Sequence, residues 1–199
     1  MLARLLIFVT VMLFGPLFIE VYLYHPLIAL EHDPVAIVPR TEAALAVSAG
    51  FLVLAFDNKV TAILFGIVAA LAIAVGVIGT AIHLALHATS LAQLATDPSV
   101  WLGGPPPLVP LTFAASGCLG LIALAMPRQR PSGSSPVAIG RRLEGLAALC
   151  GLAAAIAGSF AQGGATAFLA AMAALALGML GLLAEIVVVV FRGFDNRTA

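Results

Sequence analysis

The chain has 199 residues, of which 62% are hydrophobic and only 9% are charged, and its mean hydropathy is +1.16. Soluble globular domains carry about 25% charged residues, so this composition excludes a soluble enzyme, a soluble nucleic-acid-binding domain and a disordered chain. The nine Lys and Arg balance the nine Asp and Glu, which leaves no basic field to attract nucleic acid. The sequence therefore predicts an all-α integral membrane protein.

Apolar runs long enough to cross a bilayer recur along the chain. About 20 apolar residues in a helix cover the roughly 30 Å hydrocarbon core of a membrane. The predicted spans are, in chain order, about 4–24, 42–57, 60–87, 108–126, 143–161 and 165–191. We therefore expect one membrane domain, residues 1–199, folded as a polytopic bundle of about six transmembrane helices.

The connecting segments differ in charge. With six spans, the N-terminus, the polar turn at 57–59, the basic linker 127–142 and the C-terminal tail share one side of the membrane. Every Lys and Arg except Arg40 falls on that side. Short basic loops stay in the cytoplasm, so we predict a multi-pass protein of the plasma (inner) membrane with both termini cytoplasmic. Trp101, the only tryptophan, lies in the opposite layer and is predicted to anchor at the lipid headgroups.

All four histidines fall on or near the predicted outer face. His83 and His87 are spaced i, i+4 near the end of the third span, which places both rings on one side of a helix. Two imidazoles in such an arrangement can bind one metal ion. Alternatively, one of them can bind a haem or pigment together with His25 from the first span. The alternative is that they are interfacial side chains without a ligand. The candidate metal ligands in this layer are His83, His87, His32, Glu31 and Asp33.

Two carboxylates lie a turn or more inside the predicted spans. Glu20 is near the outer end of the first span, and Glu185 is near the cytoplasmic end of the last. Charged groups within a membrane are costly and are candidate functional residues unless they are paired. The cations expected within reach are Arg40 or a histidine for Glu20, and Arg141, Arg142 or Arg192 for Glu185.

Small residues recur at every fourth position in the later spans. Ala147, Gly151 and Ala155 form such a ridge in the fifth span, which predicts close helix packing within the chain or, as the alternative, against a partner subunit. Cys118 and Cys150 are both flanked by apolar residues and are expected to be buried thiols.

The sequence contains no metalloprotease, lipid-phosphate or nucleotide-binding motif, so we assign no catalytic residue and expect no catalytic activity from the chain alone. The leading interpretation is a structural or accessory subunit of a larger membrane complex, which could be a redox complex. Its predicted partners are the lipid bilayer and other membrane protein subunits. One alternative is a haem-, pigment- or metal-binding protein that uses the outer histidines. A second is a small-solute transporter whose outer vestibule is lined by Glu20, His25 and His83.

Overall fold

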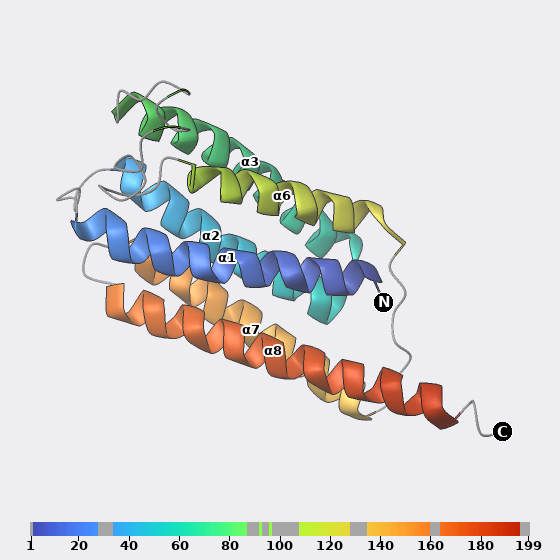
Figure 1. The fold of residues 1–199 in the computed structure, drawn as a ribbon. Coiled ribbons are helices and arrows are strands. Elements are labelled where there is room, and N and C mark those ends of the chain that lie inside the picture. The colour runs from blue at the N-terminus through green and yellow to red at the C-terminus, as the bar shows by residue number, and fades with distance from the viewer. Residues whose placement is uncertain are drawn as a thin grey trace.

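The computed structural model of the chain is an all-α bundle (Figure 1). It describes residues 2–27, 34–86, 92, 96, 108–127, 135–159 and 164–195, with no side-chain description at 22–27, 34–36, 86, 135 and 188–195. These residues form six helices and no strand: α1 (Leu2–Leu27), α2 (Pro34–Phe56), α3 (Lys59–Leu86), α6 (Pro110–Ala125), α7 (Ser135–Gly158) and α8 (Gly164–Asp195). The predicted α-helical membrane bundle is confirmed.

The helices differ in their suitability for crossing a membrane. Four are long and apolar enough, with candidate spans Leu2–Val21 in α1, Ile37–Phe56 in α2, Lys59–Ala85 in α3 and Ala165–Val187 in α8. The apolar helix α6 is shorter, with 16 residues. In α7, charged side chains occupy the first half, where Arg141, Arg142 and Glu144 occur within little more than one turn.

Helix α7 begins inside the segment predicted as a basic linker. Its first turns, from Ser135 onwards, are helical because Val137 is buried, at 1% exposure, and Gly140 packs closely against the backbone of α8. Packing therefore extends this helix beyond the apolar stretch that hydropathy detects. Helix α2 likewise begins at Pro34, well before the predicted span at 42–57.

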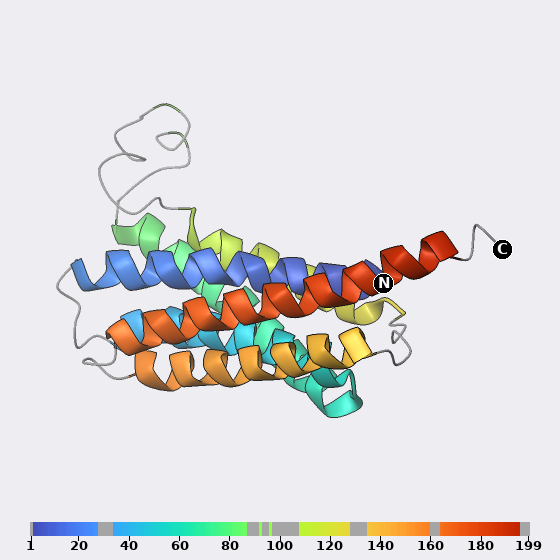
Figure 2. The ribbon, with the colours of Figure 1, turned by 90° about the horizontal axis from the view of Figure 1, so that it is seen from below.

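The helices form two rows of three. One row contains α6, α1 and α8, and the other contains α3, α2 and α7; within the array α3 pairs with α6, α1 with α2, and α7 with α8 (Figures 1 and 2). The central helices α1 and α2 are the most enclosed, with 50% and 61% of their spanning windows buried against 22% for α3. The start of α1 and the end of α8 lie at the same end of the bundle (Figure 1).

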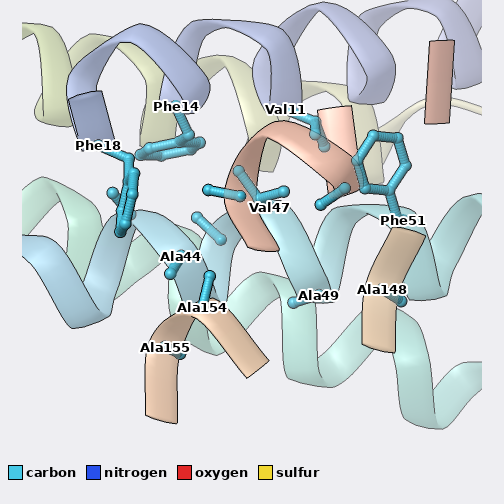
Figure 3. Close-up of a cluster of buried hydrophobic side chains, with 14 of the residues drawn as sticks. Val11, Phe14, Phe18, Ala44, Val47, Ala49, Phe51, Ala148, Ala154 and Ala155 are labelled. Atoms are coloured by element: carbon cyan, nitrogen blue, oxygen red, sulfur yellow. The ribbon is translucent and has the colours of Figure 1, made fainter. Parts of the chain in front are cut away.

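The core lies where the central pair meets its neighbours. Figure 3 shows Val11, Phe14 and Phe18 of α1 close to Val47 and Phe51 of α2, and the alanines of α7 complete this cluster. The rings of Phe14 and Phe113 meet edge to face, 6.1 Å apart, and join α1 to α6.

The small-residue ridge of α7 packs within the chain, as the sequence predicts. Ala147, Gly151 and Ala155 are all buried. A Cβ atom added at Gly151 would lie 3.0 Å from the backbone nitrogen of Ser48 in α2. At this crossing the Ser48 hydroxyl donates a hydrogen bond of 2.7 Å to the carbonyl oxygen of Ala148.

The expectation of two buried thiols is wrong for Cys118, which is exposed, whereas Cys150 is half-buried. Helix α6 turns a different face towards its neighbours, because Ser116, Gly117 and Gly120 are its buried small residues. Apolar neighbours in the sequence therefore do not imply burial in a helix whose outer face meets lipid.

Candidate functional site

Arg4 of α1 is the centre of a buried cluster of ionisable side chains. Its side chain is only 2% exposed. Nε donates a hydrogen bond of 3.2 Å to Glu185 of α8, and Nη2 donates to both oxygens of the same carboxylate at 2.9 and 2.8 Å. Nη2 also reaches Glu144 of α7 at 3.4 Å, and Nη1 donates to the carbonyl oxygen of Leu54 in α2 at 2.8 Å. One guanidinium thus connects four helices.

Two glycines bring the carboxylates together. Gly140 precedes Glu144 by one turn in α7, and Gly181 precedes Glu185 by one turn in α8. A Cβ atom at Gly140 would lie 2.7 Å from the Gly181 carbonyl oxygen and 3.0 Å from Glu185 Cγ, and one at Gly181 would lie 2.9 Å from Glu144 Cγ. Each glutamate therefore packs over the glycine of the opposite helix, and this reciprocal contact aims both carboxylates at Arg4.

The cluster contains more acidic than basic groups. Arg4 faces Glu144 and Glu185, both of which are 0% exposed. Oε1 of Glu144 is buried and has no hydrogen-bond partner within the described part of the chain. Arg141, one turn earlier on α7, is only partly buried. Charges interact strongly when they are buried away from water. Among the described residues, this cluster is therefore where electrostatic interactions are strongest.

A further buried carboxylate, Glu42, lies in the first half of α2. Its side chain is 6% exposed, and over the described ranges neither carboxylate oxygen has a hydrogen-bond partner. Next to it, the hydroxyls of Thr41 and Ser159 lie 3.2 Å apart and join α2 to the end of α7.

The predicted outer site falls mostly outside the described residues. His83 lies half-buried in the last turn of α3, and His25 lies in α1 without a described side chain. The remaining predicted residues lie outside the described ranges: Glu31, His32, Asp33, His87 and Trp101. Over the described residues no group of three or more His, Cys, Asp or Glu is placed to hold a metal ion. The metal and haem assignments stay predictions.

The two carboxylates singled out by sequence have different surroundings. Glu185 is paired, but its partner is Arg4 rather than Arg141, Arg142 or Arg192. Glu20 is half-buried on α1, and its pairing with Arg40 or a histidine stays a prediction.

Sequence reasoning missed Arg4 and Glu144 as site residues. Arg4 counted only as a basic residue near the N-terminus, and Glu144 stood among arginines at the edge of a predicted span. The repeated pattern Gly-x-x-x-Glu, at Gly140 to Glu144 and again at Gly181 to Glu185, is the feature that would have identified the pair. No family model, curated protein or solved structure matches the chain.

Proposed function

We propose that the chain is a structural or accessory subunit of a larger membrane complex. The exposed face of α3 is the main support. The residues along it are apolar and follow one another at alternating spacings of i+3 and i+4: Val60, Ile63, Ile67, Ala70, Ala74, Val77 and Ala81. This spacing is the one at which two helices pack side by side.

The middle of this α3 face contains alanines. Ala70 and Ala74 are exposed and one turn apart, flanked by Ile67 and Val77. Small residues so spaced let a second helix approach the backbone closely, which strengthens packing between membrane helices. Large side chains alone would serve equally well against lipid, so the alanines favour a helical partner.

The buried polar groups support a structural role in a second way. Ser48 bonds to α7, while Thr10 and Thr80 bond to carbonyl oxygens within their own helices. Arg4 and its carboxylates join the helices. These groups serve the packing of the bundle.

The test combines extraction in mild detergent with native mass spectrometry. We expect the wild-type chain in a species heavier than its own 20.3 kDa, with one partner in fixed stoichiometry. The double variant Ala70→Ile/Ala74→Ile should lose the partner and keep its fold. Ala153→Ile, at an exposed alanine of α7, is the matched control and should retain it. A wild-type monomer, or a double variant that still binds, would contradict the proposal.

A cofactor-binding role at the outer face is the second candidate. The ends of α1 and α3 that lead towards His25 and His87 lie at the same end of the bundle (Figure 1), which favours a shared layer of histidines. An absorption spectrum with elemental analysis tests it: a cofactor lost in His83→Ala would support this role, and a colourless, metal-free protein would end it. The transporter alternative would require liposome flux that depends on Glu20, His25 and His83.

A further inference from the structure

The Arg4 cluster has one positive group for two acidic groups. Arg4 donates three hydrogen bonds to Glu185, the closest at 2.8 Å, but only one longer bond of 3.4 Å to Glu144. The positive charge of Arg4 is therefore paired chiefly with the carboxylate of Glu185. If both carboxyl groups were ionised, the cluster would hold an excess negative charge away from water, which is strongly unfavourable.

The groups around Glu144 can be named helix by helix. Arg4 approaches from α1, Glu185 from α8, and the Leu54 carbonyl oxygen of α2 binds the same guanidinium. Arg141 lies one turn away on α7 itself and also acts on Glu144 electrostatically, but it is partly exposed, so water weakens its effect. Of these groups only Arg4 is a fully buried cation, and it is already paired with Glu185.

The uncompensated atom is Oε1 of Glu144. It is fully buried, and no hydrogen-bond partner for it exists in the described part of the chain. An ionised carboxylate oxygen has several acceptor sites to satisfy, whereas a protonated carboxyl group is neutral and loses much less on burial.

We infer that Glu144 carries a bound proton and that Arg4, Glu144 and Glu185 together form a proton-binding site inside the bundle. The proton balances the charge of the cluster, leaving one ion pair and one neutral carboxyl group. Since the site joins α1 to the α7–α8 hairpin, loss of the proton would place two like charges at the contact between those helices. This inference goes beyond the subunit role and does not depend on it.

Infrared spectroscopy of the full-length protein in lipid nanodiscs tests the inference, because a protonated carboxyl group has a C=O band distinct from that of a carboxylate. At neutral pH we expect the difference between wild type and Glu144→Gln to show the loss of one carboxylic acid band. Glu42 is buried without a hydrogen-bond partner too, so Glu42→Gln is measured separately to distinguish its band from that of Glu144. Asp57→Asn, in the turn between α2 and α3, is the control and should leave both bands in place. A Glu144→Gln difference that shows the loss of a carboxylate instead would overturn the inference.

The variant Glu185→Gln tests the charge balance itself. Removal of the competing carboxylate frees Arg4 for Glu144, so Glu144 should ionise and its acid band should disappear in this variant too. An acid band of Glu144 that persists in Glu185→Gln would contradict charge balance as the reason for the proton.

A labelling experiment needs no variant. Dicyclohexylcarbodiimide modifies protonated carboxyl groups in apolar surroundings, and mass spectrometry of the wild-type protein locates the product. We expect modification of Glu144 and not of Glu185. Modification of Glu185 with Glu144 left intact would overturn the assignment.

Discussion

At the scale of single residues, packing in this bundle depends on particular glycines. Gly178 of α8 is buried beneath the ring of Phe51, and a Cβ atom added there would collide with that ring. Phe51 is itself 0% exposed and lies in the central cluster (Figure 3), so it has little room to move. The glycine is therefore required by its neighbour and not by its backbone conformation.

We expect Gly178→Ala to destabilise the bundle by about 1–3 kcal/mol, the usual cost of overpacking a core. The matched control is Gly145→Ala in α7, where the added Cβ would meet only a Phe56 ring atom at 4.0 Å. The control should be neutral or slightly stabilising, because alanine favours a helix over glycine by about 0.5–1 kcal/mol. Denaturant titration in detergent measures both. Equal effects would mean that the contact with Phe51 is not the cause.

The residue scale also shows where sequence reasoning ends. Hydropathy identifies Glu185 as a charge within a span, and the cost of such a charge predicts that it is paired. It does not identify Arg4 as the partner, because that contact joins the first helix to the last and depends on how the whole bundle is arranged. The predicted layer at the inner face favours Arg141, Arg142 and Arg192 instead.

At the scale of the helices, the sequence predicts a helix correctly where the length and composition of the local segment determine its position. The turn between α2 and α3 was recognised from its polar residues, and there Asp57 adopts a φ of 40°. The Asn58 side chain accepts a hydrogen bond of 3.0 Å from the Thr61 amide and caps α3. The helical start of α7 was missed because it follows from burial against α8, which no local pattern reports.

At the scale of the whole molecule, the six helices named above place the start of α1 and the end of α8 at one end of the bundle (Figure 1). Which side of the membrane that end faces is a prediction from the arginines. The Arg4 cluster lies in the same layer as the basic residues of α7, so the predicted orientation places it near the cytoplasmic surface.

Cysteine labelling tests this orientation. In a background with Cys118 and Cys150 changed to alanine, Ser132→Cys in the 127–142 segment should react with a membrane-impermeant maleimide only after cells are lysed. Ser99→Cys, in the predicted outer segment, is the matched control and should react in intact cells. The reverse pattern would invert the topology, and it would move the predicted histidine layer to the cytoplasmic face.

The central claim is that the buried Arg4 guanidinium holds four helices together, and a double-mutant cycle on its closest pair, Arg4 and Glu185, tests it most directly. Loss of one partner from a buried ion pair costs about 3–5 kcal/mol when the other charge remains unpaired, so Arg4→Met should lower the free energy of unfolding by that amount. Glu185→Met should cost less, because Arg4 can then pair with Glu144. The variant Arg4→Met/Glu185→Met should recover a large part of the loss, with a coupling energy of about 1–3 kcal/mol. Single variants of unchanged stability, or losses that simply add in the double variant, would contradict the account.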